Sequence, residues 1–293
     1  MLSKFKSTYQ ILGLQGVLRS IVQKVFSPPL PSFQDSKSFF EGKTGLEIGG
    51  PSSIFRNTGQ FPVYRIAKKI DGCNFSPNTI WEGQITQGLT FNFNKTREPG
   101  MQYIAEATDL SFVPANKKYD FILAFHVIEH IANPIKAIKD WIRILKKENI
   151  LVLGIPHKEN TFDHLREVTS LSHLISDFEN NITESDTTHL EEVLEFHDYS
   201  RDFYQISKKE FIRQVENNFR YRVVHHHVFN TELAIKLLDF IGMQILSVDV
   251  FLPWHILIIA KKLSANCYCN NAKFLSNAVE YTQISPFKID HLL

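Results

Sequence analysis

The sequence has little of what marks disulfide-rich, membrane-spanning or nucleic-acid-binding proteins. It contains 3 cysteines in 293 residues, and none of them forms a Cys-x-x-Cys pair. Three cysteines cannot build a disulfide framework, so we expect a reducing, cytoplasmic location. Acidic and basic residues number 31 and 32, which leaves no strong field to attract nucleic acid. No window reaches the ~18 consecutive apolar residues of a membrane-spanning helix.

The first 27 residues favour an amphipathic helix, because apolar residues recur at helical spacing between polar ones. Two interpretations stay open for it. The helix docks on the rest of the chain, or it makes a peripheral contact with a membrane surface. The run SPPLP at residues 27–31 ends the helix, since proline cannot continue one.

The stretch TGLEIGGPSS at residues 44–53 is the most informative one in the chain. An apolar run that stops at two adjacent glycines predicts a buried strand, Thr44 to Ile48, ending in a turn. Glu47 lies near the C-terminal end of this strand, where open α/β sheets bind their ligands. We expect a second strand from Lys68 to Cys73 that stops at Asp71-Gly72. Asp71 follows the glycines by about twenty residues, the separation at which dinucleotide-type folds place a ribose-binding carboxylate.

Apolar segments and connectors then alternate. We expect strands at 103–105, 119–125 and 150–155, a short extended piece at 61–66 and an irregular stretch at 74–99. Helices are expected at 134–145 and at 231–241, the second ending near Gly242. Such alternation predicts a doubly wound parallel sheet. The apolar segments 243–251 and 254–262 are separated only by Leu252-Pro253, so they must be antiparallel.

Residues 157–230 break this rhythm, being polar and rich in histidine, and are interpreted as a mostly helical insertion. The predicted organisation is therefore an N-terminal helical extension at 1–40, a main domain at 41–262 and a polar C-terminal tail at 263–293.

Four motifs in order resemble the class I S-adenosylmethionine-dependent methyltransferases, in particular the small-molecule, type 11-like branch. They are LEIGG, EATDLSF, the long segment YDFILAFHVIEHIANPIKAIKDWIRILKKENILVLGIP and the closing ILIIAKK. The resemblance covers about residues 42–156 and 232–262. It implies an α/β fold with a doubly wound, mostly parallel seven-stranded sheet, an antiparallel last strand and a helical insertion. It also implies S-adenosyl-L-methionine as the cofactor.

The resemblance assigns cofactor-binding roles to individual residues. Glu47, Gly49 and Gly50 would cradle the methionine end, and Asp71 would accept the ribose hydroxyls. Glu106 and Ala107 would meet the adenine, and Ala124 to His126 would line the floor under the sulfonium. The chain departs from the family pattern at Pro51, which removes one backbone donor from the loop.

Methyl transfer requires a base only if the acceptor loses a proton as it attacks. His126 and His157 are the candidates, since each follows a strand and histidine accepts protons near neutral pH. The insertion is expected to form the pocket for a small-molecule acceptor, such as a sugar or glycan precursor. Its candidate polar residues are Asp163, His164, Arg166, His189, His197, Asp198 and His225 to His227. Their spacings match no standard metal site, so no metal is predicted, although a metal bound by Asp163, His164, His197 or His227 is an open alternative.

Three alternative functions are compatible with parts of the chain. His126, Glu129 and His130 fit the H-x-x-E-H string of a metal-dependent hydrolase, but such a site needs both histidines on one helical face. A nicotinamide oxidoreductase would require the fuller G-x-G-x-x-G pattern, which GGPSSIF lacks. The third alternative is a methyltransferase-like binding module without catalytic activity, which Pro51 favours.

Overall fold

The computed structural model describes residues 28–114, 116–202, 206–265, 267–276 and 280–292. The amphipathic helix expected at residues 1–27 lies outside these ranges. Within them, no helix has the length and apolar character needed to cross a membrane.

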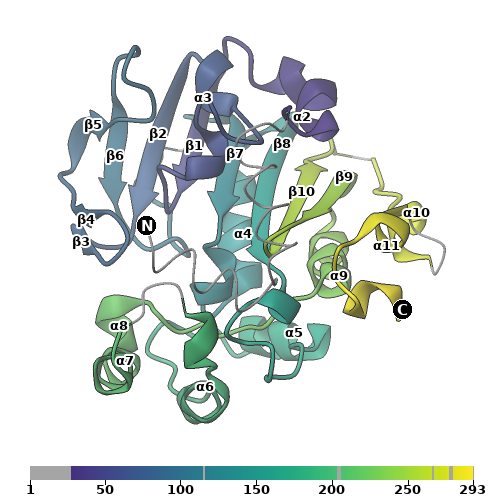
Figure 1. Ribbon diagram of the computed structural model, residues 1–293. Helices are drawn as coiled ribbons and strands as arrows, with labels where there is room; N and C mark the ends of the chain where they lie inside the picture. The colour runs from purple at the N-terminus through teal and green to yellow at the C-terminus, as the bar shows by residue number, and fades with distance from the viewer. Residues whose placement is uncertain (1–27, 115, 203–205, 266, 277–279, 293) are drawn as a thin grey trace.

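An eight-stranded sheet forms the centre of the molecule, in the order β5-β6-β2-β1-β7-β8-β10-β9 (Figure 1). The run β6-β2-β1-β7-β8 is parallel, whereas β10 is antiparallel to both of its neighbours. This order confirms a doubly wound α/β fold with an antiparallel last strand. The bounds are β1 Thr44–Ile48, β2 Lys69–Asn74, β5 Gly88–Phe91, β6 Gly100–Ile104, β7 Tyr119–Phe125, β8 Leu145–Pro156, β9 Gln244–Phe251 and β10 His255–Lys261.

The edge strand β5 pairs antiparallel with β6 and makes the sheet one strand wider than expected. It belongs to a stretch predicted to be irregular, which also contains the small hairpin of β3 Asn78–Thr79 and β4 Gly83–Gln84. These strands are too short to produce an alternating pattern that sequence inspection could detect.

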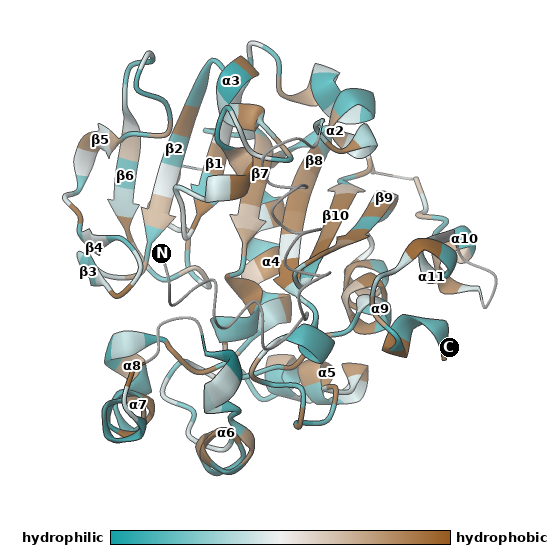
Figure 2. Cartoon of the chain, in the orientation of Figure 1, coloured by the Kyte–Doolittle hydropathy of each residue, from teal (hydrophilic) through white to brown (hydrophobic). Residues whose placement is uncertain are grey.

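Helices cover both faces of the sheet, whose central strands are its most hydrophobic part (Figure 2). One face packs against α4 Pro134–Ile144, α5 Leu171–Glu179 and α9 Thr231–Ile241. The other packs against α2 Pro31–Ser36, the 3-10 turn η2 Ser53–Phe55 and α3 Val63–Ile66. This second face is rich in phenylalanine; the Phe40 ring lies edge-on to Phe61 and Phe121 at 5.6 and 5.2 Å between centroids.

The sequence predicted the start of α4 and both ends of α9 correctly. The Asn133 side chain accepts a hydrogen bond of 3.0 Å from the Lys136 amide, and Pro134 occupies the first helical turn. Helix α9 ends at Gly242, whose φ of +84° is the left-handed conformation that glycine adopts without strain.

Two expected elements are wrong. Residues 61–66 were expected to be extended, but residues 63–66 form the helical turn α3. The second strand does not stop at Asp71-Gly72, because β2 continues to Asn74. An Asp-Gly pair favours a turn in isolation, but here both residues pair with β1 inside the sheet.

The insertion lies beyond the C-terminal ends of the parallel strands (Figure 1). Besides α5 it contains α6 Leu190–Phe196, α7 Lys208–Glu216 and α8 Asn218–Tyr221. The C-terminal segment, expected to be a polar tail, includes α10 Ala272–Leu275, α11 Glu280–Ile284 and the turn η6 Ile289–His291. It packs on the domain, because Phe287 and Asp290 are both fully buried.

Candidate functional site

The loop after β1 is braced by the buried carboxylate of Glu47. Tyr64 donates its hydroxyl to Glu47 Oε2 at 2.5 Å, and the Ser52 amide donates to Glu47 Oε1 at 2.8 Å. Burial raises the pKa of Glu47 to about 7, against the opposing effect of these hydrogen bonds. A Cβ at Gly50 would lie 2.2 Å from Glu47 Cδ. Glu47 therefore fixes the loop conformation from inside the protein, and Gly50 is needed for the two to pack.

The same loop offers few amides to a ligand. The Gly49 amide donates to the Cys73 carbonyl at 2.8 Å, the Ser52 amide is used by Glu47, and Pro51 has none. Gly49 adopts a φ of +77° and passes close to Val127, where an added Cβ would lie 2.5 Å from Cγ2. The glycines thus allow close packing between the loop and the segment after β7.

Asp71 is directed away from this loop. Its carboxylate accepts hydrogen bonds from Lys117 Nζ at 3.1 Å, the Tyr119 hydroxyl at 2.8 Å and the Met101 amide at 2.9 Å. Tyr119 is the first residue of β7, so these contacts lie toward the N-terminal ends of the parallel strands. The geometry gives Asp71 an ion pair with Lys117, three residues before the C-terminal end of β2.

Asn74, and not Asp71, is the residue at the C-terminal end of β2. Its Nδ2 donates to the Gly50 carbonyl at 3.0 Å, which ties the strand end to the loop. Its Oδ1 is buried and has no hydrogen-bond partner among the described residues. A buried acceptor without a partner is costly unless a ligand or water satisfies it. Sequence analysis missed Asn74 because the expected acid lies three positions earlier.

Glu106, which follows β6, is held by the insertion. Arg222 donates to Glu106 Oε1 at 2.7 Å and also pairs with Glu184, so one guanidinium joins two carboxylates. Burial raises the pKa of Glu184 to about 7 in spite of Arg222. The carbonyl of the next residue, Ala107, accepts a hydrogen bond of 2.7 Å from Trp141 Nε1. Arg222 was not predicted; a charged residue in a long insertion gives no sequence signal of its partner.

His126 directly follows β7 and adopts a left-handed conformation with a φ of +56°, which is uncommon for a residue other than glycine. Its amide donates to the Gly154 carbonyl at 2.9 Å, and its ring stacks on Phe125 at 4.2 Å between centroids. Nε2 lies 3.1 Å from His255 Nδ1. Burial, followed by the nearby His255, lowers the pKa of His126 well below its usual value, so the ring is neutral at pH 7.

A second group of titratable side chains combines residues that come shortly after His126 with one residue of the insertion. Glu129 is buried, its Oε2 lacks a hydrogen-bond partner within the described structure, and burial raises its pKa to about 7. His130 donates through Nδ1 to the Val224 carbonyl at 3.1 Å. His225 pairs with Asp163, which raises its pKa although burial alone would lower it. One ligand atom from each of Glu129, His130 and His225 lies within 4.8 Å of the others.

His126 does not belong to that group, which contradicts the geometry required by the hydrolase alternative. The H-x-x-E-H string needs both histidines on one helical face. Instead, Ile128–His130 forms a short 3-10 turn, and the His126 ring is directed at His255.

His157, the second candidate base, is fully buried. Its Nδ1 accepts a hydrogen bond of 3.2 Å from the Glu159 amide, and its Nε2 lies 3.3 Å from Asp290 Oδ1. The ring also stacks on Phe287 at 4.0 Å between centroids. Both nitrogens are engaged, and the side chain anchors the C-terminal segment.

The polar residues of the insertion form separate pairs. Asp163 binds Arg166 at 2.9 Å as well as His225, and His164 lies 2.9 Å from Asp198. His197 is buried beside Asp202 at 3.4 Å. Asp163, His164 and Arg166 are thus engaged in ion pairs, whereas both ring nitrogens of His197 are buried without a hydrogen-bond partner among the described residues.

Comparisons with known proteins indicate the family of the chain. A family model described as a methyltransferase domain matches residues 18–217. No curated protein shows significant similarity to the chain.

Many solved structures share the fold. An S-adenosylmethionine-dependent methyltransferase from Aquifex aeolicus is 13% identical, with 82% of this chain and 96% of that chain covered and a TM-score of 0.40. An arsenic(III) S-adenosylmethionine methyltransferase from Chlamydomonas reinhardtii is 10% identical, with coverages of 83% and 77% and a TM-score of 0.45. The N-methyltransferase NodS from Bradyrhizobium japonicum is 10% identical, with coverages of 80% and 98% and a TM-score of 0.42.

The family model spans more than half of the chain and includes the glycine loop, the strand ends and most of the insertion. The strand order and the acid-braced loop are independent of that match. The chain therefore belongs to the class I S-adenosylmethionine-dependent methyltransferases, and S-adenosyl-L-methionine is its cofactor.

Proposed function

We propose that this methyltransferase modifies a small, polar acceptor, a sugar or glycan precursor being the class to test first, and that it acts in the cytoplasm. The observation that supports a small acceptor is the Arg222 bridge, which ties the insertion to Glu106 at the end of β6. Because this bridge holds the insertion next to the strand ends, we expect the acceptor to pass beneath the insertion, and a small molecule does so more easily than a large one. Three unpaired cysteines are consistent with a reducing compartment.

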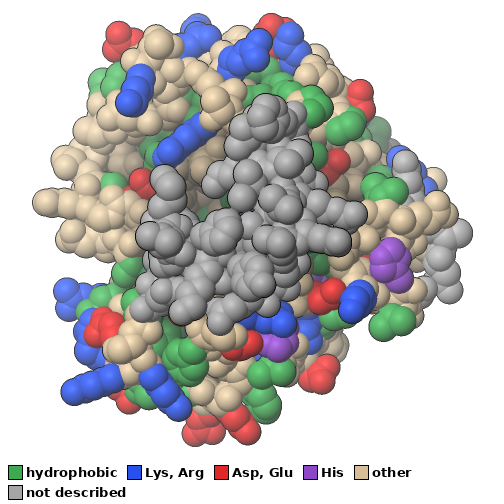
Figure 3. Space-filling view, in the orientation of Figure 1, with side chains coloured by type: hydrophobic (Ala, Val, Ile, Leu, Met, Phe, Trp, Pro, Cys, Tyr) green, Lys and Arg blue, Asp and Glu red, His purple; other side chains and the backbone are tan. Residues whose placement is uncertain are grey.

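The surface charge argues in the same direction. On the described surface visible in Figure 3, basic and acidic side chains are interspersed and neither sign forms a continuous patch. A nucleic-acid substrate would favour a basic stripe that follows the phosphate backbone.

The residues at the strand ends fit the cofactor. We propose that Gly49 and Gly50 allow its methionine end to approach the backbone, while Glu47 fixes the loop. Asn74, with its unsatisfied buried Oδ1, takes the ribose-facing position that Asp71 was expected to fill.

We propose that Glu106 and Ala107 lie beside the adenine. Glu106 keeps one oxygen on Arg222, and its side chain is 40% exposed.

The cofactor, when bound, supplies an activated methyl group for direct displacement. The protein then has to align the acceptor and, for a hydroxyl acceptor, remove its proton. We propose His126 for the proton, because it lies at the end of β7 and is neutral at pH 7. His157 is not proposed as the base, since burial and its two partners leave it no access to an acceptor.

Isothermal titration calorimetry with S-adenosylmethionine tests the cofactor assignments. We expect Asn74→Ala to weaken binding and Asp71→Asn to leave it unchanged, although the second variant loses stability. Equal affinity for wild type and Asn74→Ala would contradict the assignment of Asn74.

A screen of sugars, sugar nucleotides and other small metabolites, with transfer of a labelled methyl group as the readout, tests the acceptor. His126→Ala should retain cofactor binding and lose turnover, whereas His291→Ala, an exposed histidine near the C-terminus, should retain both. Full turnover in His126→Ala would exclude it as the base, and failure of every glycan would exclude the sugar class.

One observation favours a second candidate, a binding module without turnover. The Gly49 and Ser52 amides are used inside the protein and Pro51 has none, so the loop holds a ligand with fewer donors. Absence of binding at millimolar S-adenosylmethionine would support this candidate and contradict the proposed catalysis.

A further inference from the structure

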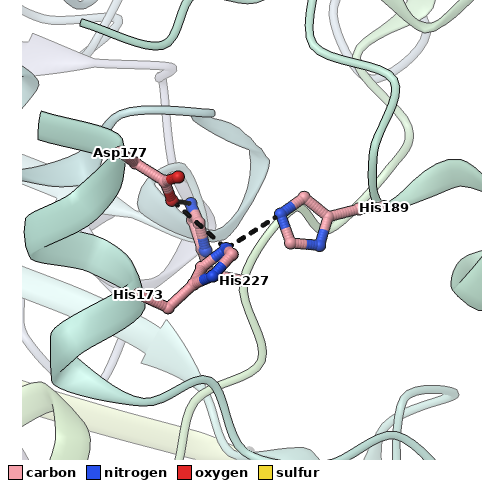
Figure 4. A group of neighbouring side chains, drawn as sticks. All are labelled: His173, Asp177, His189 and His227. Atoms are coloured by element: carbon pink, nitrogen blue, oxygen red, sulfur yellow. Dashed lines mark hydrogen bonds and ion pairs between the residues drawn. The ribbon is translucent and has the colours of Figure 1, made fainter. Parts of the chain in front are cut away.

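A group of four side chains lies in the insertion, apart from the strand-end site. His173 and Asp177 are four residues apart on α5, His189 directly precedes α6, and His227 precedes α9 (Figure 4). One ligand atom from each lies within 4.8 Å of all the others. The side chains come from three separate segments of the chain and are directed toward one another.

The spacing of the ligand atoms is that of a small coordination shell. His173 Nε2 lies 3.2 Å from His189 Nε2 and 3.4 Å from Asp177 Oδ2, and His227 Nε2 lies 3.6 Å from Asp177 Oδ2. Adjacent ligands of a tetrahedral ion with bonds of about 2.0–2.1 Å are about 3.3–3.4 Å apart by geometry. The three separations between ligand atoms, 3.2, 3.4 and 3.6 Å, lie close to that value.

One atom that the ion would contact, Asp177 Oδ2, is buried without a hydrogen-bond partner in the described part of the chain. Native proteins leave few buried polar atoms unsatisfied, and a bound ion is one of the ways in which such atoms are satisfied. The His227 ring also places Nε2 at 3.1 Å from the Ala132 carbonyl. Coordination through Nε2 would replace that contact with a metal bond.

One of the four side chains, His189, faces a carboxylate outside the group with its second ring nitrogen. His189 Nδ1 faces the Glu192 carboxylate at 3.8 Å, while its Nε2 faces His173. Histidines that bind metals usually direct the second ring nitrogen at a carboxylate or a carbonyl. Asp186 and His226 form a neighbouring group that also includes His189, so they lie next to this arrangement and outside its four members.

We propose that His173, Asp177, His189 and His227 bind one divalent transition-metal ion, with Zn²⁺ as the expected occupant. Three imidazoles and one carboxylate form a donor set that suits zinc better than Mg²⁺ or Ca²⁺, which prefer oxygen ligands. Four protein ligands leave no open position, which is the pattern of a structural site. Sequence analysis predicted no metal, because the ligands are spread over residues 173–227 and only the His173–Asp177 pair has helical spacing.

The site would fasten the insertion to the catalytic domain. The Asp177 carbonyl accepts a hydrogen bond of 2.9 Å from Asn133 Nδ2, the residue that caps α4. The Ala132 amide, in the same segment, donates a hydrogen bond to Glu184 of the insertion. A metal at the group would thus hold α5, the start of α6 and the His227 segment against the chain that follows β7.

The alternative is a hydrogen-bonded cluster with no metal, in which His173 and His189 share a proton across their 3.2 Å contact. Titration of chelator-treated full-length protein with Co²⁺, followed by displacement with Zn²⁺, separates the two. A metal site predicts one equivalent of bound Co²⁺, the intense visible absorption of tetrahedral Co²⁺, and its loss on addition of Zn²⁺. Wild-type protein that binds neither ion would overturn the proposal without recourse to any variant.

Variants then identify the ligands. His173→Ala and His189→Ala should lower Zn²⁺ affinity by more than the roughly 10–100-fold that loss of an outer-shell partner costs. Asp177→Asn keeps the size of the side chain and should also weaken binding. His164→Ala, a histidine of the insertion paired with Asp198, is the matched control and should bind like wild type.

Thermal unfolding provides a second readout. Zn²⁺ should raise the melting temperature of wild type and of His164→Ala, because an ion that binds only the folded state stabilises it. It should not raise that of Asp177→Asn. Equal metal affinity in all these variants and wild type would place any bound ion elsewhere and refute the assignment.

Discussion

Glu129→Gln should change how the stability of the protein depends on pH. Glu129 is 1% exposed, and burial raises its pKa from 4.5 to about 7, while the charge of His225 opposes the rise. The folded state therefore keeps a proton on this carboxyl at pH values where the unfolded chain has lost it. The free energy of unfolding must fall as the pH rises from 4.5 to about 7, and it levels off above that.

The size of this effect follows from the difference between the two pKa values of Glu129, 4.5 in the unfolded chain and about 7 in the folded protein. At about 1.4 kcal/mol per pH unit, the contribution of Glu129 to the free energy of unfolding declines by about 3 kcal/mol across this range. Glutamine has nearly the same shape and cannot ionise, so the variant lacks this decline. Glu47 and Glu184, whose pKa values burial also raises to about 7, contribute to both proteins and cancel in the comparison.

Urea unfolding of wild type and Glu129→Gln at several pH values between 4.5 and 8 measures the effect. The difference between the two proteins should shift in favour of the variant by about 3 kcal/mol toward pH 8. Any constant penalty for burying the amide is the same at every pH and drops out. Glu210→Gln is the control, because its exposed carboxyl has a pKa lowered to about 2 by hydrogen bonds from Arg213, and its offset should not vary with pH. A wild-type–variant difference that stays constant between pH 4.5 and 8 would refute the assignment of a raised pKa to Glu129.

Three further variants test other parts of the structure. Gly50→Ala should abolish detectable cofactor binding in calorimetry, since its Cβ would lie 2.2 Å from a buried carboxyl carbon; Gly83→Asn, at an open left-handed position, should bind normally. Trp141→Phe should lower the free energy of unfolding by about 1–3 kcal/mol, because a backbone carbonyl after β6 loses its donor; an unchanged urea midpoint would contradict this. Arg222→Gln should destabilise the protein more at pH 8 than at pH 5.5, because the buried Glu184 loses its counter-charge when ionised; equal losses at both pH values would argue against the bridge.

The buried framework was predictable because its signals are local. Strand β1 and helix α9 have the bounds expected from apolar runs and a terminal glycine. The antiparallel end of the sheet followed from the short connection between β9 and β10. The edge strand β5 and the turn α3 were missed, because a few residues packed by their neighbours produce no periodicity of their own.

The roles of individual side chains were also predictable only where the signal was local. The glycines after β1 were identified correctly as a close-packed turn, since only a few residue types tolerate that backbone. The second strand was expected to stop at Asp71-Gly72 and instead continues to Asn74, because the position of a strand end depends on pairing with β1 and β6. His157 resembled a base in sequence, and its partner Asp290 lies 133 residues further along the chain.

The sequence by itself determined the class of fold, the family and the cofactor, because a buried parallel sheet and a glycine loop impose patterns on consecutive residues. Only the tertiary structure decided which polar groups meet. Arg222 with Glu106, His126 with His255, and the metal-like group of His173 and Asp177 with His189 and His227 join distant segments. Such contacts arise from the packing of the insertion on the strand ends, and long-range pairing of charges leaves no periodic trace in a single chain.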